Sequence, residues 1–452
     1  MTSTTRVQRF ETRQIHAGQS PDTATGSRVL PIYQTTAFVF PSAQVAADRF
    51  ALQDLGPIYT RIGNPTQEVV ENRIANLEGG VGALLVASGA SAIHLAILNV
   101  AGAGDHIVAS PSLYGGTFNL LKHTLPKIGI TTTFVSDPGN LDEWRAAIQP
   151  NTKLLFGETV PNPKCDVLDI AGIAKVAHQA GVPLFADNTV PTPFLLRPIE
   201  HGADVVIHST TKYLGGHGSA MGGAIVDAGR FDYGAHPDRF PGFNTPDESY
   251  NGLVYARDLG EGGAFGVNLS FILKARVQLL RDLGPAIAPF NAFLLAQGVE
   301  TLSLRMERHV ANAQRVAEFL DARSEVANVH YAGLPSSPYR TLADKYLPNG
   351  VGAVLAFELA AVNDDVARAA GQAFVGALQL HSNVANIGDV RSLVIHPAST
   401  THSQLSTAEQ RLSGVVPGLV RLAVGLEHID DILADLELGF AAANEALRHA
   451  AA

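Results

Sequence analysis

Residues 208–218, HSTTKYLGGHG, combine a lysine, several hydroxyl side chains and a run of glycines. The hydroxyls of Ser209 and Thr211 are suited to hold a phosphate group, while Lys212 beside them can reach an aldehyde carbon of the same ligand. An unperturbed lysine, with a pKa of about 10.4, is a poor nucleophile near neutral pH, but burial and cationic neighbours lower that pKa and free the amine. The spacing matches neither a GxxxxGK[ST] phosphate loop nor, at GEGGAFG (260–266), a dinucleotide fingerprint. The segment therefore predicts a lysine that forms a Schiff base with a phosphorylated aldehyde.

Two other groups of residues follow apolar runs and could bind parts of the same ligand. Ser88, Gly89 and Ala90 come after the run ALLVA and before an expected helix, so this turn offers backbone N–H groups and the positive end of a helix dipole to an anion. Asp187 comes after the run VPLFA. A buried carboxylate is costly unless a cation pairs with it, and the protonated nitrogen of a pyridine ring is such a cation. The alternatives are an ordinary strand-to-helix turn and an Asp that caps the next segment.

These residues follow short apolar runs that alternate with helical stretches between residues 80 and 227. The alternation predicts a mainly parallel, seven-stranded sheet with helices on both faces, that is, an α/β fold. Ligands bind such sheets at the carboxyl ends of the strands, where these residues lie. The expected strands are 83–87, 106–110, 130–135, 153–157, 182–186, 204–208 and 223–226.

The rest of the chain has a different character. Residues 1–64 are rich in loops and are expected to form an N-terminal arm, while residues 65–285 form the large domain that contains the sheet. Within it, residues 228–268 are rich in Gly, Pro and aromatic side chains. After residue 285 longer helices such as 303–322 appear with a few strands, so residues 286–452 are expected to form a smaller α+β domain.

Composition excludes several classes of protein. The 452 residues include 46% hydrophobic and 16% charged residues, which is typical of a globular chain. A net charge of -10 argues against nucleic-acid or anionic-membrane partners. Cys165 is the only cysteine, and the sequence has neither an HExxH motif nor a Cys/His cluster, so we expect no disulfide, no metal and a reducing cytoplasm. The uncharged run 81–104 is interpreted as a strand, a turn and a helix; a transmembrane helix is the weaker alternative.

HSTTKYLGGHG resembles the lysine signature of the Cys/Met-metabolism enzymes, the γ-family of fold type I, which depend on pyridoxal 5'-phosphate (PLP). The resemblance runs nearly the length of the chain and implies PLP as the cofactor, bound to Lys212. It also implies the fold type I architecture, with the arm contacting a neighbouring subunit. The other matching motifs are IHAGQ (15–19), YTRIGNPT (59–66), SGASA (88–92), LYGGT (113–117), ETVPNP (158–163), ADNT (186–189) and VRLAVGLE (420–427).

The resemblance also implies a role for individual residues. Tyr59 and Arg61 would reach the phosphate of the neighbouring subunit's cofactor, with Tyr59 counted among the catalytic residues, so the active unit would be at least a dimer. An Arg fork suits a phosphate dianion. Tyr114 would stack on the cofactor ring and help move protons at the leaving group, and Arg421 would clamp the substrate carboxylate. The other implied cofactor residues are Ser88, Gly89, Ala90, Asn162, Asp187, Thr189, Ser209 and Thr211.

Two segments, 231–255 and 381–405, resemble the O-acetylhomoserine sulfhydrylases in particular. The lyases and cystathionine-forming synthases tend to have Ser-Leu-Gly where this chain has Asn386-Ile387-Gly388, which places Asn386 among the expected substrate-binding residues. We therefore expect γ-replacement on O-acetyl-L-homoserine by sulfide, giving L-homocysteine and acetate in methionine biosynthesis. The alternatives are a cystathionine γ-synthase, a methionine or cystathionine γ-lyase, and a PLP-binding protein without catalysis. The ester, acetyl or succinyl, the sulfur donor and the choice of dimer or tetramer stay open, although the family is usually tetrameric.

Overall fold

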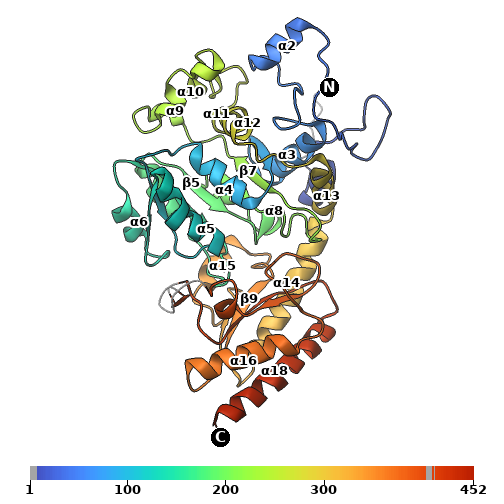
Figure 1. Ribbon diagram of the computed structural model, residues 1–452, viewed down its shortest axis with the longest axis vertical. Coiled ribbons are helices and arrows are strands. Elements are labelled where there is room, and N and C mark those ends of the chain that lie inside the picture. Colours follow the sequence, from blue (N-terminus) through green and yellow to red (C-terminus); the bar gives the residue numbers. More distant parts are fainter. Residues whose placement is uncertain (1–7, 404–409, 412, 452) are drawn as a thin grey trace.

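The computed structural model describes residues 8–403, 410–411 and 413–451, and its centre is a seven-stranded sheet (Figure 1). The sheet order is β1-β7-β6-β5-β4-β2-β3, in which β7 runs antiparallel to β1 and β6 and the other neighbours are parallel. All seven strands expected from the apolar runs are present, within two residues of the expected limits at either end. The mainly parallel sheet and the α/β fold are therefore confirmed. The strands are β1 Gly82–Val86, β2 His106–Ala109, β3 Thr131–Phe134, β4 Thr152–Glu158, β5 Leu184–Asp187, β6 Val205–His208 and β7 Gly223–Asp227.

Successive side chains of these strands enter two different cores, because the side chains of a strand point to alternate faces of the sheet. Leu85 belongs to a core that also contains the buried faces of α3 (Pro65–Glu78) and α7 (Ile170–Gln179). Leu84 belongs to the core on the other face, together with α4 (Gly89–Leu98). The strands are thus covered on both sides, which explains why they read as continuous apolar runs.

A second, five-stranded sheet lies below the first in the view of Figure 1. Its order is β10-β11-β12-β9-β8, and α16 packs along α18. Phe357, Phe374 and Phe440 meet between this sheet and these two helices, with ring centroids 5.0–5.9 Å apart. The elements are α14 Leu302–Asp321, β8 Val326–His330, β9 Val354–Leu359, α16 Asp364–Ala377, β10 Ser382–Asn383, β11 Leu393–Ile395, β12 Leu419–Ala423 and α18 Ile429–Ala451.

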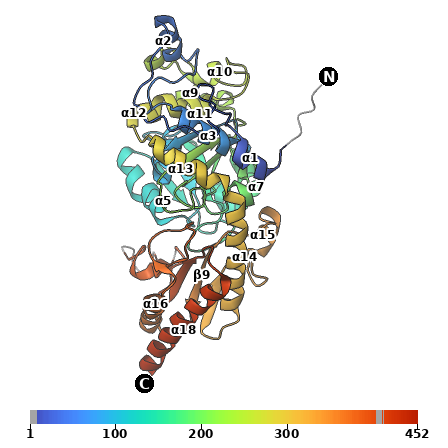
Figure 2. The same ribbon diagram turned by 90° about the vertical axis from the view of Figure 1, so that its right-hand side faces the viewer.

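The arm contains two short helices, α1 (Phe10–His16) and α2 (Ala43–Phe50), joined by irregular chain. Figures 1 and 2 both place α2 at the far end of the molecule from α18. The arm carries apolar side chains that are unusually exposed, among them Val39 at 94% and Phe50 at 62%. Exposed apolar side chains gathered in one segment are typical of a surface that contacts another chain. The domain limits at residues 64 and 285 stay a prediction.

The aromatic segment 228–268 covers one face of the first sheet. Tyr233 stacks on Phe243 at 4.2 Å between ring centroids, and both rings belong to the same core as α4. The ammonium group of Lys274 lies 5.0 Å from the Phe243 ring centroid and donates a hydrogen bond to Asn99 O at 3.0 Å. The segment is therefore a packed part of the fold.

The remaining helices are short or connect the two sheets. Residues 81–104 form β1, a turn and α4, as expected, and in the described part of the chain we find no helix long and apolar enough to cross a membrane. The remaining α-helices are α5 Gly115–Asn119, α6 Leu141–Ala147, α8 Thr192–Leu195, α9 Pro241–Asn244, α10 Tyr255–Asp258, α11 Ser270–Lys274, α12 Arg281–Leu283, α13 Pro289–Glu300 and α15 Arg340–Tyr346. There are π-helical turns at Leu120–Thr124 and Ala275–Leu280, and 3₁₀ turns at Leu125–Ile128, Pro198–His201, Tyr233–Ala235, Glu248–Tyr250 and Pro397–Ser399.

Candidate active site

The carboxyl ends of β1 and β6 meet closely, because both strands run in the same direction on either side of β7. Gly89, directly after Ser88, lies so near the chain after β6 that a Cβ on it would be 2.6 Å from Ser209 Cβ. Only glycine fits such an approach. The turn at Ser88–Ala90 and the segment around Lys212 are therefore parts of one site.

The hydroxyls near this turn already have partners within the chain. Ser88 Oγ accepts a hydrogen bond from Ser91 N at 3.1 Å and so caps α4. Thr211 Oγ1 donates to Gly222 O at 3.2 Å and accepts from Gly222 N at 3.1 Å. These bonds hold the two segments in place around the first turn of α4, where backbone N–H groups point outward and favour an anion.

Lys212 lies partly buried behind this turn, at the junction of the two sheets. Its Nζ donates a hydrogen bond to Asn386 Oδ1 at 2.5 Å. Burial, followed by the charge of Arg421, lowers the pKa of Lys212 to about 8. Gly388 has a φ of 73°, and a Cβ there would be 2.6 Å from Tyr213 N, so the loop that carries Asn386 lies directly on the lysine segment. The lowered pKa confirms the expected direction and makes the amine a better nucleophile.

Arg421, on β12, is buried without an acidic partner among the described residues. Its Nη1 donates to Asn162 Oδ1 at 3.2 Å and its Nη2 to Asn386 O at 2.8 Å, while its Nε has no partner there. Burial lowers the pKa of this guanidinium to about 10. A buried cation without an anion is costly, so the site is suited to a ligand that supplies a carboxylate. Arg391, in contrast, is already paired with Asp389 at 2.7 Å.

Asp187 ends β5, and one oxygen of its carboxylate is held by two hydrogen bonds from Thr189. Thr189 donates to Asp187 Oδ1 from its backbone N at 2.9 Å and from its hydroxyl at 2.5 Å. Ser209 N donates in turn to the Thr189 hydroxyl at 2.8 Å, which links the ends of β5 and β6. Burial raises the pKa of Asp187, so the ionised form needs a nearby cation, and the pyridinium nitrogen of PLP fits this requirement.

The structure does not bring every expected residue to the lysine. Tyr114 follows β2 at the same edge, with its side chain 57% exposed, and its backbone N donates to Glu158 Oε1 at 2.6 Å. Tyr59 and Arg61 are exposed and contact each other, with the guanidinium 5.5 Å from the ring centroid. Within the described ranges neither residue is hydrogen-bonded to the Lys212 cluster. Their expected role toward a neighbouring subunit stays a prediction.

Sequence reasoning missed Glu158 and a fully buried pair behind the site. His208 Nε2 lies 2.6 Å from Glu78 Oε1, and Asn188 donates to the same oxygen at 3.0 Å. Glu158 is the first residue of ETVPNP and pairs with Asp187 in the strand register. The available signal was position, since Glu158, Asn188 and His208 all lie at or beside the ends of central strands, where a polar side chain needs a reason.

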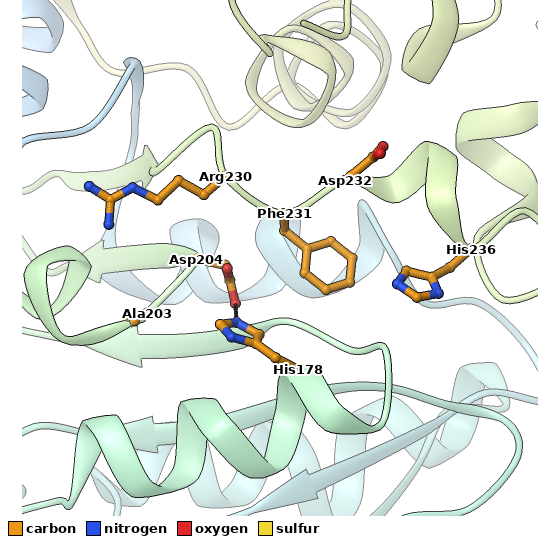
Figure 3. A pocket seen from close by; sticks show the side chains of 8 residues that line it. His178, Ala203, Asp204, Arg230, Phe231, Asp232 and His236 are labelled. Atoms are coloured by element: carbon orange, nitrogen blue, oxygen red, sulfur yellow. Dashed lines mark hydrogen bonds and ion pairs between the residues drawn. The ribbon is translucent and has the colours of Figure 1, made fainter.

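A hollow of about 440 Å³ lies near the other ends of β5 and β6 (Figure 3). His178 Nε2 contacts Asp204 Oδ2 at 2.8 Å, and the ring of Phe231 lies between His178 and His236. None of the expected site residues lines it. Its lining residues are His178, Gly202, Ala203, Asp204, Arg230, Phe231, Asp232 and His236.

The chain is similar to known proteins over almost its whole length. Residues 11–441 match the family described as Cys/Met metabolism PLP-dependent enzyme. The chain is 55% identical to O-acetyl-L-homoserine sulfhydrylase of Corynebacterium glutamicum, over 96% of this chain and 97% of the relative, and 50% identical to homocysteine synthase of Schizosaccharomyces pombe, over 94% and 96%.

Two solved structures extend the comparison. A crystal structure from Campylobacter jejuni, described as an O-acetylhomoserine (thiol)-lyase with N'-pyridoxyl-lysine-5'-monophosphate, has a TM-score of 0.90 and 40% identity, covering 96% of this chain and all of that one. Cystathionine γ-lyase of Lactobacillus plantarum has a TM-score of 0.80 and 33% identity, covering 97% of this chain and all of that one.

The lowered pKa of Lys212 predicts how the protein without cofactor takes up PLP. Only the neutral amine attacks an aldehyde, so the uptake rate should rise about tenfold per pH unit below pH 8 and level off above it. Stopped-flow absorbance at 400–430 nm would measure the rate. Arg421→Gln serves as the comparison, because loss of its charge should move the midpoint to higher pH. A wild-type rate that keeps rising tenfold per unit beyond pH 9 would contradict the prediction.

Proposed function

Because the chain belongs to the Cys/Met metabolism PLP-dependent enzymes, we propose that it converts O-acetyl-L-homoserine and sulfide into L-homocysteine and acetate. This is the γ-replacement of direct sulfhydrylation in methionine biosynthesis. The observation that carries the proposal is the contact of Lys212 with Asn386, beside Arg421, which has no acidic partner among the described residues. This contact supports roles for Lys212 as a base and for Arg421 as a cation that binds a carboxylate. The names of the relatives with 50–55% identity support the same reaction.

PLP, when bound, acts as an electron sink for charge that develops on the substrate carbons next to the amino group. The residues that would hold its phosphate surround the turn at the start of α4, and Asp187 would face its ring nitrogen. Tyr114 would cover the ring, and Asn162 and Thr189 would lie at its polar edge. The proposed phosphate residues of the same chain are Ser88, Gly89, Ala90, Ser209 and Thr211.

Arg421 would bind the α-carboxylate of the substrate. Its guanidinium is already positioned by Asn162 and by the backbone of Asn386, so little conformational entropy is lost when the carboxylate arrives. A planar guanidinium binds a carboxylate through two parallel hydrogen bonds, which fixes the orientation of the α-carbon. The α-hydrogen then faces a defined direction, as proton abstraction requires.

Lys212 Nζ would take the proton from the α-carbon and then one from the β-carbon, as a general base. Acetate leaves from the γ-carbon, sulfide adds to the same carbon, and Lys212 returns protons to the β- and α-carbons. Asn386 Oδ1 accepts a hydrogen bond from Nζ at 2.5 Å and so can hold the protonated amine while the nucleophile arrives. The side-chain amide of Asn386 has no acidic proton, so it cannot assist hydrolysis, the reaction that competes with the addition of sulfide.

We further propose that the active unit is at least a dimer and that the family's tetramer is its full assembly. Tyr59 and Arg61 would complete the phosphate site of the neighbouring subunit, as their exposure and mutual contact allow. The exposed apolar side chains of the arm support this role. A cytoplasmic location is proposed from the single, buried thiol of Cys165.

The proposed reaction predicts products that depend on sulfide. With O-acetyl-L-homoserine and sulfide, the purified holoenzyme should form homocysteine at least about tenfold faster than oxobutyrate. Lys212→Ala should reduce the rate by about 10²–10⁴-fold, because the general base is lost. Chromatography of both products, with and without sulfide, measures this. Mainly oxobutyrate and ammonia without sulfide would mean a γ-lyase, and O-succinylhomoserine or cysteine as better substrates would mean a cystathionine γ-synthase.

Asn386→Ser should raise the ratio of oxobutyrate to homocysteine at limiting sulfide by about two- to tenfold, the equivalent of one hydrogen bond. The serine side chain is shorter than that of asparagine, so the 2.5 Å contact with Lys212 is lost. The serine hydroxyl, unlike the amide, can take part in proton transfer. Asn383→Ser, at an exposed position of β10, is the matched control and should leave the ratio unchanged. An unchanged ratio in Asn386→Ser would limit Asn386 to a structural role.

Mixed oligomers of Arg61→Ala and Lys212→Ala should recover activity that neither variant has alone. If Arg61 serves the neighbour, each mixed dimer holds one site with both an intact arginine and an intact lysine. Random pairing then gives about one quarter of wild-type activity in the unfractionated mixture, and the mixed dimer purified through both tags gives about one half. The two differently tagged chains are co-expressed, the mixed oligomer is purified through both tags, and the pure oligomers are the controls. Activity no higher than that of the pure oligomers would place Arg61 outside the neighbour's site.

A further inference from the structure

Two buried carboxyl groups lie side by side at the edge of the sheet that carries the site. Glu158 is the last residue of β4 and pairs in register with Asp187, the last residue of β5. Each is only 8% exposed. A third buried carboxyl, Asp166, acts on Glu158 from the loop after β4.

Two adjacent carboxylates cannot both be ionised here at low cost. Removal from water penalises each charge, and the two like charges repel strongly where the effective dielectric constant is low. Such a pair shares one proton between two sites. Burial, followed by the charge of Asp187, raises the pKa of Glu158 well above its ordinary value.

The surrounding groups decide which of the two keeps its charge. Asp187 Oδ1 accepts two hydrogen bonds from Thr189, and His208, next to it on β6, favours the ionised form of Asp187. Among the described residues, Glu158 accepts one hydrogen bond, from Tyr114 N, and the charges that act on it are those of the acidic groups Asp187 and Asp166. The proton therefore belongs on Glu158, whose Oε2 has no partner among the described residues.

Glu158 also determines where Tyr114 begins its helical turn. Its Oε1 accepts from Tyr114 N at 2.6 Å, directly before α5. The Tyr114 ring lies over Gly116, where a Cβ would be 2.4 Å from Cε1. The carboxyl of Glu158 thus holds the backbone of Tyr114, while Gly116 leaves space for its ring.

We propose that Glu158 is a positioning residue that acts as a neutral carboxylic acid, fixing Tyr114 while Asp187 carries the only negative charge that faces the ring nitrogen of the cofactor. The inference rests on the proposed function for the places of Tyr114 and Asp187. It adds a role to a residue that touches neither substrate nor cofactor in that scheme. It predicts that the charge of Glu158 is dispensable and its acceptor oxygen is not.

Two substitutions of nearly equal size separate charge from acceptor. Glu158→Gln keeps an oxygen for Tyr114 N and is neutral, so its PLP dissociation constant should stay within about twofold of wild type. Glu158→Met removes the acceptor and should weaken PLP by about two- to tenfold, the range of one lost neutral hydrogen bond. The visible circular dichroism of bound PLP should stay unchanged in the Gln variant. It should decrease in the Met variant, because the Tyr114 ring that would cover the cofactor is no longer held in a fixed position.

The measurements are titrations of cofactor-free protein with PLP and visible circular dichroism spectra, both without substrate. Glu307→Gln and Glu307→Met, at an exposed position of α14, are the matched controls and should behave as wild type. Equal losses in Glu158→Gln and Glu158→Met would overturn the proposal by showing that the charge is required, and so would a Met variant equal to wild type. If the Met variant does not fold, a weakened Gln variant alone overturns the proposal and an unchanged one supports it.

Failure of the proposed function is visible separately. If wild-type protein made no homocysteine with sulfide, the reaction would be wrong, but the cofactor titrations and spectra would still decide the role of Glu158.

Discussion

The site is organised around the cost of keeping positive charge out of water. Arg421 is buried, Lys212 is partly buried beside it, and neither has a carboxylate partner in the described part of the chain. Burial lowers both pKa values, and the charge of Arg421 lowers that of Lys212 further. Such an arrangement is unfavourable by itself, and the rest of the fold has to hold it. The carboxylate of an arriving substrate relieves that cost, so substrate binding draws on the same unfavourable burial of charge.

Two sheets are needed to build this arrangement. The first sheet supplies Lys212, Asp187 and the anion-binding turn at the ends of its strands. The second supplies Arg421 from β12 and Asn386 from the loop between β10 and β11. Arg305 on α14 joins the two parts, since it donates to the backbone oxygens of Tyr213 and Gly298 at 2.7 and 2.6 Å. The reactive lysine is thus held from both sides, which limits the freedom it would otherwise have.

The strands and the residues at their ends could be predicted because buried parallel strands read as plain apolar runs, so the polar residue that follows each run stands out. Lys212 and Asp187 were found in this way. The contact between Lys212 and Asn386 could not be found, because 174 residues separate them and no local pattern records which loop lies on which strand end. Glu158 was missed for another reason. Its importance depends on the register of β4 against β5, which a single sequence does not encode. The roles of Tyr59 and Arg61 follow neither from the apolar runs of the sequence nor from contacts within one chain, since their expected partner is on another chain.

Gly388 limits the space in which the two sheets meet. The backbone is left-handed at this position, and a Cβ there would be only 2.6 Å from Tyr213 N. The lysine segment and the Asn386 loop therefore lie too close together for any side chain larger than the hydrogen of glycine. Gly388, like Gly89 at the start of α4, leaves no room for a side chain. The distance between the two halves of the site therefore stays constant as long as glycine occupies these two positions.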